Sequence, residues 1–179
     1  MRKQLRPTDV KRLNRTWRRN TENRLSLILE SVTGPFNVGS IFRSAAAFGV
    51  DQIWLAGNAT PPTNPKAGKT ALGTERLVTW HEAVPALDAV KAAKDDGYVV
   101  LAIELTAEAV PLHRADFERD VCLVVGSEDH GCSPAVLDAV DGVCYIPQVG
   151  RVGSFNVSVA AAIALAEARR QEWAKLPDL

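Results

Sequence analysis

Apolar residues gather in short runs along the chain, and each run is followed by glycine or by polar residues. Runs of this length with such flanks are typical of buried β-strands. They predict strands over residues 25–30, 52–56, 98–104, 121–125 and 143–146.

Other segments carry apolar residues at helical spacing. This spacing predicts a helix over residues 37–48 with Asn37 as its cap, a helix over 80–95, a short helix that starts at Ser133-Pro134, and a final helix that is capped by Ser154 or Asn156 and reaches about Trp173. Strands and helices therefore alternate, which favours an α/β fold with a largely parallel sheet. Gly57 to Gly73 is rich in Pro, Asn, Gly and Lys and predicts a long loop, of the kind that is usually functional or mobile.

Charge is distributed unevenly, although 21 basic and 21 acidic side chains cancel. Residues 1–24 hold nine basic and two acidic side chains, a net charge of +7, and the remainder is correspondingly acidic. We therefore divide the chain into a basic arm, residues 1–24, and one domain, residues 25–179. A basic arm on an acidic body suggests a polyanionic partner, with a solvated tail as the alternative. The candidate RNA-binding residues are Arg12, Arg15, Arg18 and Arg19.

Several classes of protein are disfavoured. Cys122, Cys132 and Cys144 are few, odd in number and not at the spacing of metal ligands, which argues against a disulfide framework or a metal site and fits a reducing cytoplasm. No apolar run approaches the roughly 20 residues of a membrane span, and the N-terminus lacks an apolar signal core, so we expect no membrane association.

Three polar motifs carry the candidate chemistry. The first is Asn37-Val-Gly39-Ser-Ile-Phe-Arg43, which places an arginine in an otherwise apolar helix. We expect this arginine to be buried, and a buried arginine needs a carboxylate, phosphate or carbonyl partner; a structural salt bridge is the alternative. The second is the turn Gly126-Ser-Glu128-Asp-His130-Gly131. Glu128 can be an acid, a base, a hydrogen-bond acceptor or a plain surface carboxylate, and His130 fits a solvent-facing turn. The turn is neither a phosphate-binding loop nor a dinucleotide fingerprint.

The third motif runs from Ile146 to Ser158, and its glycine-rich loop opens directly into an alanine-rich helix. In this order the three motifs resemble the SPOUT class of methyltransferases, and within it the SpoU/TrmH family of RNA ribose 2'-O-methyltransferases. The resemblance covers about Leu25 to Trp173. Phe155 stands where the family usually has Leu, and the second motif is an uncommon variant, but no polar motif residue is lost.

The resemblance implies a C-terminal segment threaded into a deep trefoil knot, a homodimer whose site needs both subunits, and bound S-adenosylmethionine. Carried over by motif, the catalytic positions are Arg43, Asn37, Glu128, Ser154 and Asn156. The cofactor-binding positions are Leu105, Thr106, Gly126, Gly131, Ile146, Gln148, Ser154 and Phe155. The residue matching Arg43 is proposed in the family to activate the ribose hydroxyl, although an arginine is a poor base, so electrostatic stabilisation is at least as plausible.

The expected activity is 2'-O-methylation of RNA, with a guanosine in the tRNA D-loop as the favoured target because the basic arm and short C-terminal end look most like that subgroup. The tRNA wobble ribose and a ribosomal RNA ribose are alternatives. Two rivals remain from other classes: a catalytically silent RNA-binding module of the same fold, and a small-molecule enzyme with a nucleotide cofactor.

Overall fold

A computed structural model of the chain describes residues 3–176, apart from the side chains of residues 83 and 84. In this range the strands form one parallel sheet in the order β3-β2-β1-β6-β4-β7-β5. The strands are β1 Leu25–Glu30, β2 Gln52–Ala56, β3 Thr79–Val84, β4 Val99–Ile103, β5 Val110–Pro111, β6 Val121–Val125 and β7 Gly142–Tyr145. The α-helices are α1 Pro7–Arg19, α2 Pro35–Phe48, α3 Pro65–Ala71, α4 Ala86–Asp95, α5 Pro134–Ala139 and α6 Val157–Trp173. The predicted α/β class with a parallel sheet is confirmed.

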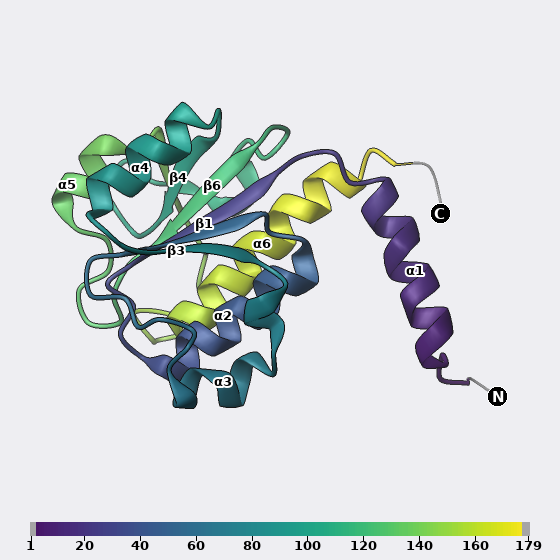
Figure 1. Cartoon of the computed structure of the whole chain (residues 1–179). Coiled ribbons are helices and arrows are strands. Elements are labelled where there is room, and N and C mark those ends of the chain that lie inside the picture. The colour runs from purple at the N-terminus through teal and green to yellow at the C-terminus, as the bar shows by residue number, and fades with distance from the viewer. Residues whose placement is uncertain (1–2, 177–179) are drawn as a thin grey trace.

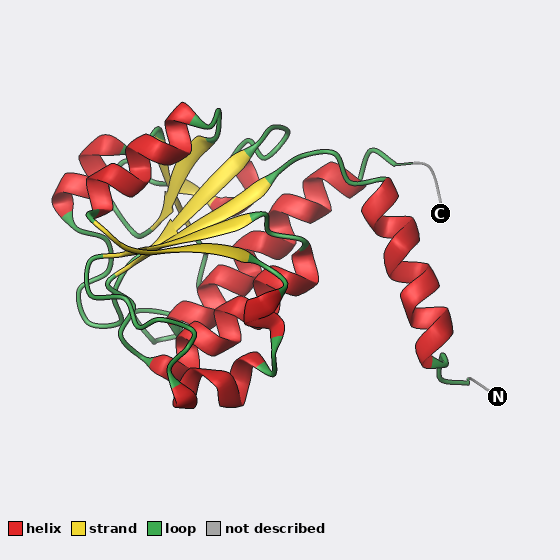
Figure 2. Ribbon diagram, viewed as in Figure 1, coloured by secondary structure: helices red, strands yellow, loops and turns green. Residues whose placement is uncertain are grey.

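Helices cover both faces of the sheet, so the strands are apolar on both sides (Figures 1 and 2). Leu27 and Leu29 belong to the core shared with α2 and α6, whereas Ile28 belongs to the core shared with α4 and α5. Every residue of β1 and β6 is buried, which explains why these strands stand out as unbroken apolar runs.

The path of the chain brings distant segments together at one edge of the sheet. After β1 the chain builds β2 and β3 on one side, and it then crosses to β4 and β5 on the other. The later strands are inserted, β6 between β1 and β4, and β7 between β4 and β5. The carboxyl ends of β1, β6 and β4 therefore meet where the strand order reverses, which is the usual place for a ligand site in parallel α/β sheets.

Two predicted elements are wrong in part. The predicted loop 57–73 contains α3, which begins after the Asn64 cap with Pro65 in its first turn. α3 lies so close to α2 that a Cβ on Gly39 would be 2.1 Å from the carbonyl oxygen of Ala67. The space beside Gly39 is thus filled by α3.

The predicted helix over 80–95 is also divided. Its first part belongs to β3, and α4 begins only after Pro85. At the start of α2, Gly34 occupies the N-cap position with Pro35 in the first turn, so the predicted Asn37 cap is wrong as well. The Asn37 side chain makes contacts in the candidate site described below.

α1 projects from the body, and its residues are all exposed or half-buried (Figure 1). α1 contacts the end of α6, where the ring centroids of Trp17 and Trp173 lie 4.9 Å apart. Arg2, counted in the basic arm, lies outside the described residues. None of the helices in the described part is long and apolar enough to cross a membrane.

Candidate active site

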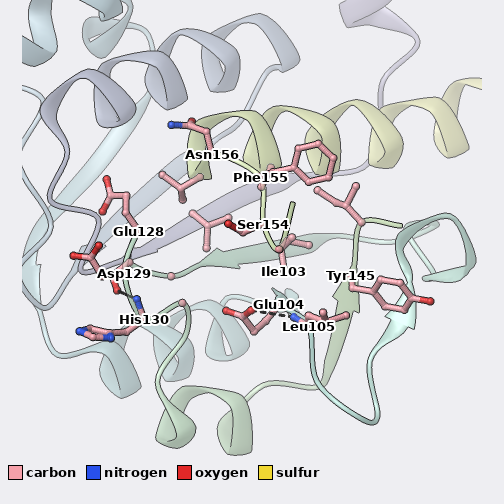
Figure 3. A pocket seen from close by; sticks show the side chains of 18 of the residues that line it. Ile103, Glu104, Leu105, Glu128, Asp129, His130, Tyr145, Ser154, Phe155 and Asn156 are labelled. Carbon is pink, nitrogen blue, oxygen red and sulfur yellow. Dashed lines mark hydrogen bonds between the residues drawn. The ribbon is translucent and has the colours of Figure 1, made fainter. Parts of the chain in front are cut away.

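A cavity of about 480 Å³ opens at the carboxyl ends of β4, β6 and β7 (Figure 3). Its walls come from the residues that follow these strands and from the segment that leads into α6. Figure 3 shows Phe155 and Asn156 along one side, Glu104 and Leu105 along the other, and Ser154 between them. The size is that of a small-molecule ligand site.

The turn after β6 is built from close backbone contacts. A Cβ on Gly126 would lie 2.0 Å from the carbonyl carbon of Gly131 and 2.2 Å from the amide nitrogen of Cys132. Ser127 and Gly131 exchange two backbone hydrogen bonds of 3.0 and 2.9 Å. Gly131 adopts a φ of +66°, in the region that favours glycine. Both glycines of the motif are therefore required by the backbone.

A chain of hydrogen bonds joins three motif residues that are distant in sequence. The amide nitrogen of the Asn156 side chain donates to the Asn37 Oδ1 at 2.9 Å. The Asn37 Nδ2 in turn donates to the Glu128 Oε1 at 2.8 Å. Asn156 also caps α6 through its Oδ1, which accepts from the amide of Ser158 at 2.9 Å. The order Asn156, Asn37, Glu128 thus links the starts of α6 and α2 to the turn after β6.

Three donors in the described part of the chain form hydrogen bonds to the Glu128 carboxylate. Besides Asn37, the amides of Gly34 and Thr33 donate to its oxygens at 2.9 and 3.2 Å. Desolvation raises the pKa of Glu128, but the hydrogen bonds from Asn37, Gly34 and Thr33 outweigh it, so the pKa lies below the usual value. Glu128 is therefore ionised at neutral pH, and its lowered pKa makes it a weaker proton acceptor than an ordinary glutamate.

The described lining of the cavity is acidic. It contains Glu104, Glu128 and Asp129 but neither lysine nor arginine, and His130 is exposed. A cavity with these charges favours a cationic ligand and disfavours a phosphate group. Glu104 was absent from the predicted site residues. Its signal was an acidic residue directly after an apolar strand, the position that contacts ribose in dinucleotide-binding folds.

Most predicted site residues meet at the cavity. The lining includes Leu105, Gly126, Glu128, Gly131, Ile146, Gln148, Ser154, Phe155 and Asn156. Asn37 contacts two of these residues without lining the cavity itself. Thr106 lies next to the lining but outside it.

Arg43 also lies apart from the lining. Its side chain is exposed, which corrects the expectation of a buried arginine. Within residues 3–176 it forms neither an ion pair nor a side-chain hydrogen bond, so the structural salt bridge considered as the alternative is absent from the described chain.

These features define a parallel α/β protein with a glycine-walled, acidic cavity of the size of a small-molecule site. Residues 24–166 match the model of the SpoU rRNA Methylase family, and the chain belongs to this family.

Several methyltransferases are similar to the chain in sequence. An uncharacterised tRNA/rRNA methyltransferase of Synechocystis is 36% identical over 84% of the chain and 55% of its own length. A 23S rRNA (guanosine-2'-O-)-methyltransferase of Acinetobacter baylyi is 35% identical over 85% and 62%, respectively. A tRNA (guanosine(18)-2'-O)-methyltransferase of Thermus thermophilus is 34% identical over 82% and 75%.

The fold is also similar to that of a solved methyltransferase. An AdoMet-bound rRNA methyltransferase of Sinorhizobium meliloti superimposes with a TM-score of 0.79 at 29% identity, covering 85% of this chain and 58% of the other. The chain thus spans little more than half the length of several proteins that it matches.

Proposed function

We propose that this protein is an RNA 2'-O-methyltransferase that uses S-adenosylmethionine. The observation that carries the proposal is the acidic cavity beside the Asn156–Asn37–Glu128 chain, where all three sequence motifs meet. A catalytically silent module has no need to keep this chain of polar side chains intact. The absence of lysine and arginine from the described lining speaks against a phosphate-bearing cofactor.

The cavity suits S-adenosylmethionine in size and charge. The backbone near Gly126, Gly131 and Ile146 would line the cofactor, and Gln148, Ser154 and Phe155 would complete the wall, with Leu105 opposite and Thr106 next to it. When bound, this cofactor supplies a methyl group made electrophilic by a sulfonium. The net positive charge of the cofactor is complemented by the carboxylates Glu104, Glu128 and Asp129.

Asn37, Glu128 and Asn156 act as positioning residues in this proposal. Glu128 is ionised and engaged with three donors, so it fixes the loop before α2. Asn156 fixes the start of α6, next to Ser154 and Phe155. Together they hold the cavity wall in the geometry that in-line methyl transfer requires. Ser154 adds a hydroxyl at the cavity.

Arg43 stabilises the developing charge on the ribose 2'-oxygen. A guanidinium remains protonated at neutral pH, so it serves better as an electrostatic partner than as a base. Arg43 follows Asn37 by six residues on α2, which turns it by about 240° around the helix and moves it about 9 Å along the axis. It therefore faces away from the Asn37 network of its own chain.

A homodimer resolves this separation, because a second copy can bring its own Arg43 to the cavity. The outer surfaces of α2 and α6 suit such an interface. They expose apolar or small side chains, among them Phe36, Ala47, Val159 and Ala166. α6 begins with an almost unbroken apolar sequence, as expected of a helix that is covered on both sides. We also propose the knotted threading of the C-terminal segment that the family implies.

The substrate we favour is a guanosine ribose in the tRNA D-loop. Relatives named for 23S rRNA and for tRNA both act on guanosine, which supports the nucleotide. The arm supports an RNA partner, since Arg12, Arg15, Arg18 and Arg19 are all exposed on α1. Basic side chains contact RNA phosphates without sequence preference, so the arm adds affinity rather than choosing the nucleotide. A ribosomal RNA ribose and the tRNA wobble ribose are the alternatives.

Ribose methylation in RNA from cells with and without the gene tests this proposal. Mass spectrometric mapping should show one tRNA 2'-O-methylguanosine that disappears with the gene and returns with the wild-type gene. Loss of a ribosomal RNA or wobble-position methyl group instead would move the substrate to that alternative. An unchanged pattern of ribose methylation in all RNA would contradict the proposed function.

A further inference from the structure

Two carboxylates hold consecutive amides at the start of α5. The Glu104 Oε2 accepts from the amide of Cys132 at 2.9 Å, and the Glu30 Oε2 accepts from the amide of Ser133 at 3.0 Å. Only Glu104 lines the cavity, whereas Glu30 is buried, with 6% of its surface exposed. One carboxylate of this pair therefore lies at the cavity wall, and the other is buried away from it.

The bonding of Glu104 leaves acceptor capacity on both oxygens. Its Oε1 accepts from the amide of Leu105 at 3.0 Å, and its Oε2 is engaged with Cys132. Each oxygen of an ionised carboxylate can accept about two hydrogen bonds. By this count one acceptor site remains on each oxygen, and the two protein amides hold the carboxylate in place at the cavity wall. A ligand with two neighbouring O–H donors fits them.

Glu104 also stands at the right place along the cavity. In Figure 3 it lies between the turn that carries Asp129 and His130 and the apolar wall near Leu105 and Tyr145. In S-adenosylmethionine the ribose lies between an aromatic base and a cationic amino-acid arm. An apolar wall suits the base and the acidic turn suits the cationic arm, which leaves the ribose at Glu104.

We propose that Glu104 binds the vicinal hydroxyls of the cofactor ribose, accepting one hydrogen bond on each carboxylate oxygen. The proposal rests on the proposed cofactor site and adds a specificity-determining residue to it. An acidic residue at the end of a parallel strand has the same task in dinucleotide-binding folds, where the chemistry of a ribose diol and a carboxylate is the same.

Ligand analogues test this role without any reaction. Calorimetry measures the affinity of the full chain for S-adenosylhomocysteine and for its 2'-deoxy and 3'-deoxy analogues. The variants are Glu104→Gln and the matched control Glu30→Gln, the same change on the neighbouring amide. A hydrogen bond to a charged acceptor contributes roughly tenfold to hundredfold in affinity. Wild-type protein and Glu30→Gln should lose about this factor when a ligand hydroxyl is removed, and Glu104→Gln should lose much less.

A second ligand separates ribose from amino-acid binding. 5'-Methylthioadenosine keeps the diol but lacks the amino acid, so Glu104→Gln should weaken its binding as it weakens that of S-adenosylhomocysteine. Equal affinity of wild-type protein for S-adenosylhomocysteine and both deoxy analogues would overturn the inference, even if Glu104→Gln fails to fold. An effect of Glu104→Gln that vanishes with 5'-methylthioadenosine would assign the carboxylate to the amino group instead. Failure of wild-type protein to bind S-adenosylhomocysteine at all would contradict the proposed function itself.

Discussion

Replacing Gly126 by alanine should damage both the stability of the protein and its affinity for the cofactor. The added Cβ would lie 2.0 Å from the Gly131 carbonyl carbon and 2.2 Å from the Cys132 nitrogen, and both are backbone atoms. Ordinary contacts of a Cβ are longer than 3 Å, so this backbone must move by about 1 Å. Overpacking of this kind costs about 1–3 kcal/mol. The move also strains the Ser127–Gly131 and Glu104–Cys132 hydrogen bonds, each worth about 1 kcal/mol.

The free energy of unfolding should therefore fall by about 2–4 kcal/mol, which lowers Tm by roughly 5–15 °C in a chain of this size. Affinity for S-adenosylhomocysteine should also fall, because the backbone that moves is part of the cavity wall. The added methyl group of Gly126→Ala would collide with the backbone of the turn itself and would not fill space that the cofactor occupies.

Gly150→Ala is the matched control for this prediction. A Cβ at Gly150 meets nothing within 4 Å, and the residue belongs to the loop before α6 without lining the cavity. Thermal unfolding and calorimetry of both variants decide the matter. If Gly126→Ala keeps the wild-type Tm and affinity, the close-packed turn is not what shapes the site.

Three further predictions address the other parts of the site. Arg43→Ala should lower kcat by the factor that corresponds to a loss of about 2.7–4 kcal/mol of transition-state stabilisation, while the cofactor Kd changes at most a few-fold. Mixed dimers of this variant with Gly126→Ala should regain activity, because one of their two sites combines an intact cavity with an intact Arg43. Near wild-type turnover of Arg43→Ala would remove Arg43 from the mechanism. Replacing Arg12, Arg15, Arg18 and Arg19 by Gln should weaken RNA binding and reduce the slope of log affinity against log salt concentration by up to about 3. The control Lys91→Gln on α4 should leave both the affinity and the slope unchanged. An unchanged slope in the arginine variant would make α1 a solvated helix. Glu128→Gln should lower stability by about 1 kcal/mol at pH 7, since the hydrogen bonds to the exposed carboxylate are partly offset by water. Because the folded pKa of Glu128 is lowered, this difference should shrink as the pH falls through the folded pKa, and a pH-independent difference in urea denaturation would contradict the assignment.

The buried strands and the last helix could be predicted from the sequence, because their signals are local. β1 and β6 are unbroken apolar runs, and the cap of α6 is supplied by Asn156, one of the two candidates. α3 was missed because its seven residues begin with proline and include glycine, so its signal was that of a loop. α3 packs against α2 at Gly39, where the missing side chain lets the two backbones approach closely.

The residues of the candidate site also differ in how well the sequence predicts them. Residues of the glycine-rich turns could be predicted because the motifs place them beside each other in the sequence. The Asn156–Asn37–Glu128 chain could not be predicted as contacts, since it joins segments that only the order of the parallel strands brings together. The exposure of Arg43 was missed for a similar reason. An arginine in an apolar helix looks buried unless the outer face of that helix is known to be open.

Transfer of a labelled methyl group from S-adenosylmethionine to RNA tests the central claim most directly. Purified protein is incubated with the labelled cofactor and unmodified tRNA, with Arg43→Ala as the inactive control, and the product is digested to nucleosides. The account predicts label in 2'-O-methylguanosine for the wild-type protein and little or none for the variant. Label on a nucleobase, or no transfer to tRNA or ribosomal RNA by a protein that binds S-adenosylhomocysteine, would contradict it.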